Sequence, residues 1–117
     1  MRWPYQIIGK RWLAAVGLWL AGAGAAMAAD FSVTSPGSFY SINGTSPNPL
    51  LTLVRGETYT FAVTTASNHP FQIVSPAGTT TSNNITSGTI TFRVPTNAVN
   101  YGYRCSIHGF TGTIVTV

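Results

Sequence analysis

The sequence predicts an all-β domain, a sandwich or a barrel, that follows an N-terminal targeting segment. Short runs of β-branched and aromatic residues alternate with clusters of Gly, Pro, Asn and Ser, which is typical of β-sandwiches and barrels. After residue 28, no apolar segment repeats with the 3.6-residue period of an amphipathic helix. The chain has 117 residues, enough for one domain.

The first 28 residues have the features of a secretory signal peptide. Three basic residues within the first eleven precede an apolar run over residues 12–26, which leads into the small-residue pattern Ala26-Met27-Ala28. The run is short for a membrane span and rich in Gly and Ala. We expect export to the periplasm or the medium, with cleavage after Ala28 or Ala29. A retained N-terminal anchor is the alternative.

Removal of the first 28 of the 117 residues leaves 89 residues, 29–117, as one domain. This domain has three arginines and two acidic residues, a net charge of +1, whereas the whole chain has +4. A basic surface that would favour nucleic acid is therefore missing. We expect a monomer that binds neither nucleic acid nor, once processed, a membrane.

Eight strands are expected in this domain, each bounded by turn residues. Their ranges are Phe31–Thr34, Phe39–Ile42, Leu50–Val54, Thr58–Val63, Phe71–Val74, Thr89–Val94, Tyr101–Cys105 and Thr113–Val117. Successive residues of a strand point to opposite faces, so alternating apolar residues indicate the core face of three strands. These sets are Tyr59, Phe61 and Val63; Ile90, Phe92 and Val94; and Tyr101, Tyr103 and Cys105.

Two connections carry further expectations. Arg55-Gly56-Glu57 lies between two apolar strands, which predicts a β-hairpin. The polar segment Ser75–Ser87 is rich in Thr and Asn, which predicts a long surface crossover. Phe61, Phe71 and Phe92 are expected in the core.

One cysteine and two histidines of this domain lie beside predicted strand ends. Cys105 ends a strand, His108 follows three residues later, and His69 precedes another strand. A single cysteine forms no disulfide within the chain, so its thiol is free, paired between molecules, or a metal ligand. One thiolate and two imidazoles are the in-plane ligands of a trigonal copper site, and thiolate suits Cu(I).

Other roles are open for each residue considered alone. His69 could cap backbone groups in a loop, Cys105 could be a small buried hydrophobic residue, and His108 could be an exposed turn residue. Zinc could use the same three ligands with a water, although the divalent affinity order places copper above zinc. Nucleophilic catalysis by the Cys105–His108 pair would need an orienting group and an oxyanion site. The loop suggests neither, so we expect no enzyme.

The C-terminal part of the chain resembles cupredoxins, the plastocyanin-like and amicyanin-like type 1 blue copper proteins. The resemblance extends from about Leu50 to Val117, and the upstream segment resembles that of small bacterial members. It implies an eight-stranded Greek-key β-sandwich that holds one copper ion through His69, Cys105 and His108. The residues that carry it are Asn68-His69-Pro70-Phe71, Val94-Pro95, Tyr103, Cys105-x-x-His108 and Gly112.

Two features depart from the family pattern. Cupredoxins commonly supply an axial Met shortly after the second His, whereas the processed chain contains no Met. Phe110 or Thr111 takes that place, and the backbone carbonyl of Asn68 is expected on the other axial side. The residue after the first ligand is Pro70, which has no backbone N–H to donate to the thiolate.

The resemblance implies outer-sphere electron transfer to a redox partner protein, with His108 as the exposed edge through which electrons pass. Copper delivery or storage is the alternative, since the shortened loop lacks Met. A structural β-sandwich without metal is the third interpretation.

Overall fold

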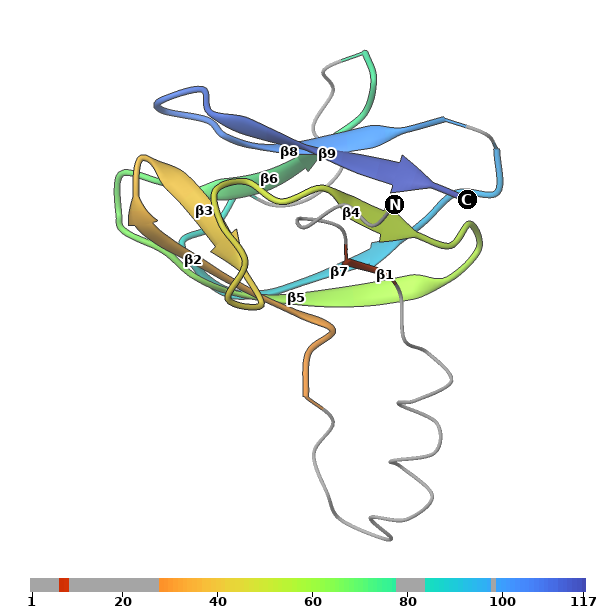
Figure 1. Ribbon diagram of the computed structural model, residues 1–117, viewed down its shortest axis with the longest axis horizontal. Coiled ribbons are helices and arrows are strands. Elements are labelled where there is room, and N and C mark those ends of the chain that lie inside the picture. The colour runs from red at the N-terminus through yellow and green to blue at the C-terminus, as the bar shows by residue number, and fades with distance from the viewer. Residues whose placement is uncertain (1–6, 9–27, 78–83, 98) are drawn as a thin grey trace, which may run out of the picture.

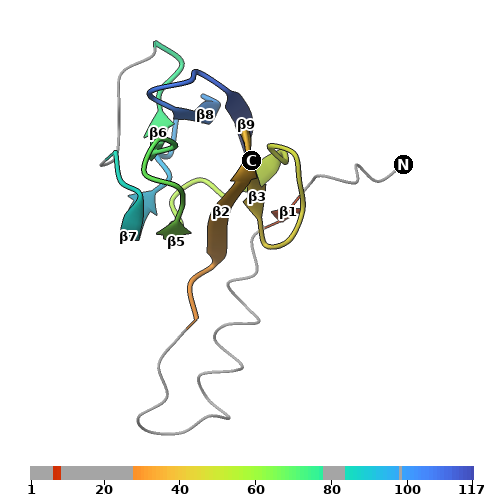
Figure 2. The ribbon, with the colours of Figure 1, turned by 90° about the vertical axis from the view of Figure 1, so that its left-hand side faces the viewer.

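The computed structural model describes residues 7–8, 28–77, 84–97 and 99–117, which form a sandwich of two β-sheets (Figures 1 and 2). One sheet has the strand order β1 (Ile7–Ile8), β4 (Leu51–Leu53), β9 (Thr111–Thr116), β8 (Tyr101–Cys105) and β6 (Phe71–Val74). The other has the order β3 (Phe39–Ile42), β2 (Phe31–Gly37), β5 (Thr58–Thr64) and β7 (Ser87–Arg93). Within the described residues, no helix is long and apolar enough to cross a membrane.

The predicted all-β sandwich is confirmed. All eight expected strands are present as β2 to β9, with ends that differ from the expected ones by at most three residues. The structure adds β1, which pairs in parallel with β4 through Ile7↔Leu51 and Ile8↔Thr52. Apart from residues 7, 8 and 28, the expected signal peptide lies outside the described residues.

The chain passes repeatedly from one sheet to the other. Among the strands that the structure describes, β2–β3 and β8–β9 are the only consecutive ones that pair as neighbours. The expected hairpin at Arg55-Gly56-Glu57 is wrong, because β4 pairs with β1 and β9 while β5 pairs with β2 and β7. Gly56 does adopt a turn conformation with φ 83°, but the turn leads across the sandwich. A turn sequence specifies a chain reversal and leaves the partner of the next strand open.

The described ends of the Ser75–Ser87 segment agree with the expected crossover, since it joins β6 in one sheet to β7 in the other. Residues 78–83 of this segment lie outside the described part. Ile85 forms an isolated bridge with Phe71, so the returning chain passes beside the start of β6.

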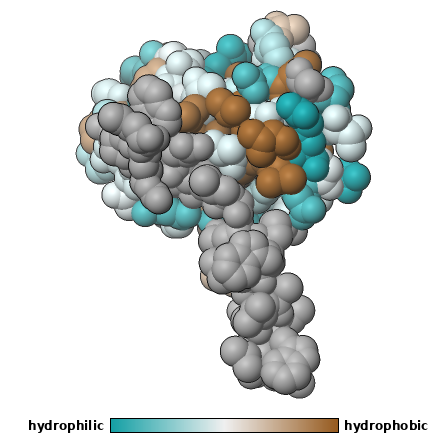
Figure 3. All heavy atoms as spheres, turned by 45° about the vertical axis from the view of Figure 1, so that its right-hand side comes forward, coloured by the Kyte–Doolittle hydropathy of each residue, from teal (hydrophilic) through white to brown (hydrophobic). Residues whose placement is uncertain are grey.

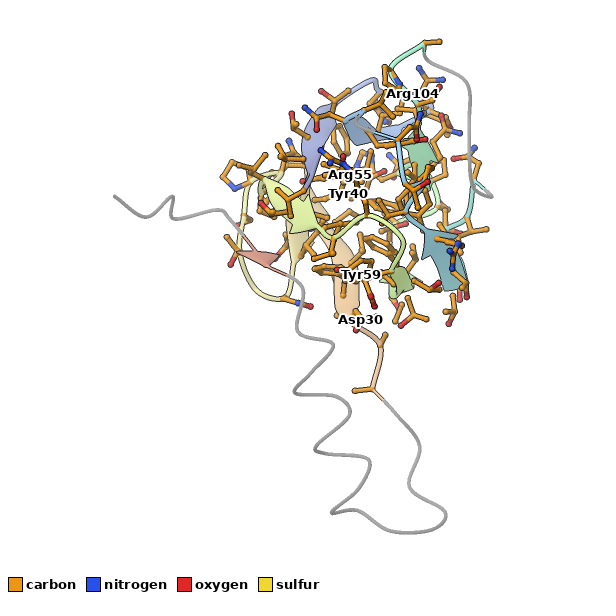
Figure 4. All side chains as sticks on the ribbon, turned by 90° about the vertical axis from the view of Figure 1, so that its right-hand side faces the viewer. Asp30, Tyr40, Arg55, Tyr59 and Arg104 are labelled. Atoms are coloured by element: carbon orange, nitrogen blue, oxygen red, sulfur yellow. The ribbon has the colours of Figure 1, made fainter. Side chains whose placement is uncertain are left out.

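Aromatic side chains from both sheets fill the core. Phe61 and Phe71 are fully buried and Phe92 is nearly so, as expected from the alternation. The same is true of Tyr40 on β3 and Tyr59 on β5; Figure 4 shows both among the side chains packed between the ribbons. This packing holds the two sheets at a fixed separation, since protein interiors are close-packed.

The connections that carry the candidate ligands lie at one end of the sandwich. The β5–β6 and β8–β9 connections are at the left in Figure 1 and face the viewer in Figure 2. Large hydrophobic residues exposed among the described residues are Val54, Ile107 and Val117. Figure 3 shows hydrophobic and hydrophilic side chains adjoining on the face it draws. Ile107 directly precedes His108, so one apolar side chain is exposed beside the ligand loop.

Candidate metal centre

The end of β8 places Cys105 in the interior at the ligand end. Its side chain has no exposed surface. The backbone turn after it is closed by two hydrogen bonds, from the Cys105 N–H to the Phe110 carbonyl (3.0 Å) and from the Gly109 N–H to the Cys105 carbonyl (2.9 Å). Gly109 has φ 79°, a conformation that glycine adopts without a steric penalty. The shortened loop is therefore a tight turn that returns the chain directly into β9.

His69 reaches the same place from the β5–β6 connection. Its backbone N–H donates to the Ala66 carbonyl at 2.9 Å, which folds the connection back toward β6. Phe71 pairs with Cys105 in the β6–β8 register, so the residues that precede Phe71 lie beside the end of β8. The His69 side chain is 8% exposed, whereas His108 is exposed.

The three predicted ligand side chains are brought together. Cys105 Sγ lies 3.8 Å from His69 Nδ1 and 4.0 Å from His108 Nδ1, and the candidate ligand atoms all lie within 4.8 Å of one another. Metal distances of about 2.0 Å to nitrogen and 2.3 Å to sulfur separate N and S by about 3.7 Å at a 120° angle and about 3.5 Å at a tetrahedral one. The observed spacing is closer to the trigonal value. This donor set fits one copper ion with small ligand movements.

Asn68 places a carbonyl oxygen at the edge of this cluster. It lies 3.0 Å from His108 Nδ1 and 3.7 Å from Cys105 Sγ. A carbonyl only accepts, so the hydrogen bond requires the His108 Nδ1 to carry the proton. A metal at Nδ1 would displace that proton, which the neutral ring would then carry at Nε2, so metal binding at His108 requires the other tautomer. The carbonyl therefore lies beside two of the three candidate ligand atoms, and its axial role stays a prediction.

The structure distinguishes between the two residues considered for the other axial side. The Phe110 ring lies 5.2 Å from the His69 ring in an edge-on arrangement and packs against the core. Thr111 is exposed at the start of β9. Phe110 is therefore the residue that shields the cluster. Met1 and Met27, the two methionines of the chain, lie outside the described residues.

A backbone donor to the thiol comes from the C-terminal loop. The His108 N–H donates to Cys105 Sγ at 3.4 Å, so one N–H faces the sulfur although Pro70 has none. Hydrogen bonds to a ligand sulfur tune a metal site. Sequence reasoning missed this donor, because residue types do not show in which direction a backbone N–H points inside a five-residue turn.

Two side-chain hydrogen bonds connect the segments around the cluster. Asn84 donates to Ser106 Oγ at 2.8 Å, which links the chain that returns beside β6 to the ligand loop. Arg104 Nε donates to Gln72 Oε1 at 2.6 Å across the β6–β8 pair. These two hydrogen bonds were not predicted from the sequence, since the partners are 22 and 32 residues apart.

Tyr40 is a buried residue beside the cluster, and sequence reasoning did not identify it. Its hydroxyl donates to the Pro70 carbonyl at 2.6 Å, and the Arg104 carbonyl lies 3.3 Å away. Burial, and secondarily the nearby Cys105 thiol, raise the pKa of Tyr40 far above its usual range. The phenol is therefore a neutral donor throughout the pH range in which the protein would function.

The fold and the cluster agree with the resemblance to type 1 copper proteins. Cys-x-x-His joins the last two strands, the upstream His precedes β6, and the three side chains lie close together. The fold is cupredoxin-like. No protein-family model matches the chain, and no curated protein matches it either.

Three solved structures are similar to this chain. A purple cupredoxin from Nitrosopumilus maritimus is 20% identical, with 75% of this chain and 100% of that chain covered and a TM-score of 0.49. The McoA multicopper oxidase from the hyperthermophile Aquifex aeolicus is 17% identical, with 74% and 26% covered and a TM-score of 0.49. A copper binding protein determined in the apo form is 18% identical, with 74% and 84% covered and a TM-score of 0.45. The chain spans about a quarter of the oxidase.

Proposed function

We propose that this chain is an exported electron-transfer protein that carries one copper ion at a type 1 site. The observation that supports it is the buried Cys105 thiol with an imidazole nitrogen at 3.8 Å and another at 4.0 Å. His69, Cys105 and His108 would hold the ion in a plane. Copper would supply the one-electron couple, and the thiolate its intense visible absorption.

The surroundings suit a metal that changes oxidation state without moving its ligands. Cys105 and His69 are buried, and Phe110 packs over His69. A ligand set held by close packing resists rearrangement. His108 is exposed and follows Ile107, which is 61% exposed. This edge would face the redox partner, and a weakly charged chain would rely on apolar rather than long-range electrostatic contact.

The geometry supports a role other than catalysis by the cysteine. A nucleophilic thiol must reach its substrate, whereas Cys105 has no exposed surface. We therefore propose that the protein is not an enzyme. It would work in the periplasm or the medium as a monomer, without nucleic acid or membrane attachment after removal of residues 1–28.

The proposal is tested by adding Cu(II) to the purified protein and recording visible absorption and electron paramagnetic resonance. An intense thiolate-to-copper band with one equivalent of copper is the expected result. The control is Cys105→Ser, which keeps both histidines and should lose the band, because the transition begins on sulfur. A coloured Cys105→Ser protein, or a wild-type protein that binds copper without the band, contradicts a type 1 site.

Copper delivery is a second candidate, favoured by the geometry of His108. This ligand is exposed, and its Nδ1 has a second partner at 3.0 Å in the Asn68 carbonyl. The side chain can therefore release a metal and stay hydrogen-bonded. Transfer of Cu(I) to a competing chelator that is much faster than electron self-exchange would favour delivery over electron transfer.

A further inference from the structure

A tyrosine from the opposite sheet contacts every segment that supports the copper ligands. Tyr40 belongs to β3, in the sheet that contains none of the three candidate ligands. Its hydroxyl lies 2.6 Å from the carbonyl of Pro70, the residue after His69, and 3.3 Å from the carbonyl of Arg104, the residue before Cys105. Its side chain is fully buried. Arg104 belongs to β8 in the other sheet, and Figure 4 labels both residues.

The ring of Tyr40 extends this contact to the third segment. It packs edge-on against Phe110, which shields the cluster (4.9 Å between ring centroids), and against Phe71, which follows Pro70 (5.0 Å). One side chain therefore contacts the chain after the first ligand, the chain before the second, and the loop that contains the third.

Tyr40 is itself held from the other side. Its backbone N–H donates to Asn48 Oδ1 and its carbonyl accepts from the Asn48 N–H, both at 2.8 Å. The side chain is thus hydrogen-bonded at both its backbone and its hydroxyl. It therefore holds the Pro70 carbonyl at a fixed distance from β3.

The Tyr40 hydroxyl supplies a hydrogen bond at Pro70, a residue that has no N–H of its own. Proline has no N–H, so it cannot donate a ladder hydrogen bond toward the end of β8. The Pro70 carbonyl is buried with the hydroxyl of Tyr40 as its donor. The hydroxyl thus connects β3 to the backbone just before β6 begins. Its partners, Pro70 and Arg104, are each one residue from a candidate ligand.

We propose that Tyr40 is a positioning residue of the copper centre, whose hydroxyl fixes the spacing between the segments that carry His69 and Cys105. This inference rests on the proposed function. In this inference, the hydrogen bond from Tyr40 to Pro70, which joins the two sheets, keeps the three candidate ligands in position before a metal binds.

The test compares Tyr40→Phe with Tyr103→Phe. Tyr103 is also fully buried, and its hydroxyl donates to another proline carbonyl, that of Pro49, at the same distance of 2.6 Å. Both variants keep the ring and lose a hydroxyl that donates to a proline carbonyl at 2.6 Å, so both should lose similar stability, although Tyr40→Phe also loses the longer contact with the Arg104 carbonyl. Only Tyr40→Phe should change the copper hyperfine splitting and the visible band, and speed Cu(II) dissociation about tenfold. Tyr103→Phe should stay within about twofold of wild type.

Two results overturn the proposal. One is a Tyr40→Phe protein with wild-type spectra and dissociation, and the other is an equal effect of Tyr103→Phe. A wild-type protein that shows no thiolate band contradicts the proposed function, and this inference with it, before any variant is compared.

A measurement on the unmodified protein covers the case in which Tyr40→Phe does not fold. The amide hydrogens of Phe71 and Cys105 donate to Ile85 and Phe110 in the two ligand segments. If Tyr40 holds these segments without metal, their exchange rates in metal-free and Cu(I)-loaded protein should agree within about tenfold. Amides that exchange freely until Cu(I) binds would overturn the proposal.

Discussion

Phe110 lies edge-on to His69, with ring centroids 5.2 Å apart and planes inclined at 65°. It comes two residues after His108 and packs at the same time against Tyr40. The ring therefore covers one side of His69 and connects it to the core. Because its ring has no donor atom, Phe110 would add no further ligand to a copper ion held by His69, Cys105 and His108, which would matter more to Cu(II) than to Cu(I), since Cu(I) tolerates three ligands.

Introducing a thioether at this position should lower the reduction potential. Phe110→Met gives the oxidised state an additional weak ligand, and a tenfold gain in relative Cu(II) affinity corresponds to about 59 mV for one electron. Thr111→Met is the matched control, because Thr111 is exposed on β9 and should leave the potential unchanged. Both are measured by voltammetry, with a spectrum to confirm the axial contact. A confirmed thioether with an unchanged or higher potential contradicts an open axial site.

The two histidines should differ in rescue by free imidazole. His108→Gly removes an exposed side chain, so added imidazole can enter from solvent and restore the thiolate-to-copper band. His69→Gly leaves a gap behind a side chain that is 8% exposed and packed against Phe110, and imidazole should fail to restore the band. An absorption titration of both copper-loaded variants checks this, and equal rescue of the two would show that burial does not control access.

Alkaline pH should destabilise the fold through two buried tyrosines. Burial raises the pKa of both Tyr40 and Tyr103 far above the usual range. Below the unfolded pKa of about 10, the phenols are protonated in both states and this contribution is complete. Above it the unfolded chain loses protons that the folded chain retains, and the free energy of unfolding falls by about 1.4 kcal/mol per pH unit for each phenol. Urea unfolding between about pH 8 and 11 measures the slope.

Tyr103→Phe provides the control for this pH dependence. It removes one of the two phenols, so the slope above the unfolded tyrosine pKa should become shallower by about 1.4 kcal/mol per pH unit. An unchanged slope would assign the alkaline transition to other groups.

The exported protein should begin at Ala29 or Asp30. Asp30 already takes part in the fold, since its N–H donates to Thr60 Oγ1 (3.1 Å) and its carboxylate accepts from the Thr60 N–H (2.9 Å). Cleavage at either predicted position preserves these hydrogen bonds. Intact-mass measurement of the protein from the exported fraction checks the start. Recovery of the full-length chain from membranes would contradict the signal peptide.

Residue type and local pattern were sufficient to predict the strands and the candidate ligands. Alternating apolar residues placed Tyr59, Phe61 and Phe92 in the core, and all three are buried. The chain has one Cys and two His, so their positions beside strand ends identified His69, Cys105 and His108 as one group. Such signals are local, because a side chain's direction in a strand and its donor atoms depend only on itself and its neighbours.

Only the tertiary structure decided how these elements meet. The turn at Arg55-Gly56-Glu57 was expected to form a hairpin but leads to the other sheet, because strand pairing depends on distant partners. The choice of Phe110 over Thr111 depended on where a five-residue turn ends and β9 begins. Tyr40 had no signal at all, since its hydroxyl bonds the backbone of residues 30 and 64 positions away. The candidate ligands can thus be read from the sequence, whereas their spacing depends on packing between two sheets that no local pattern encodes.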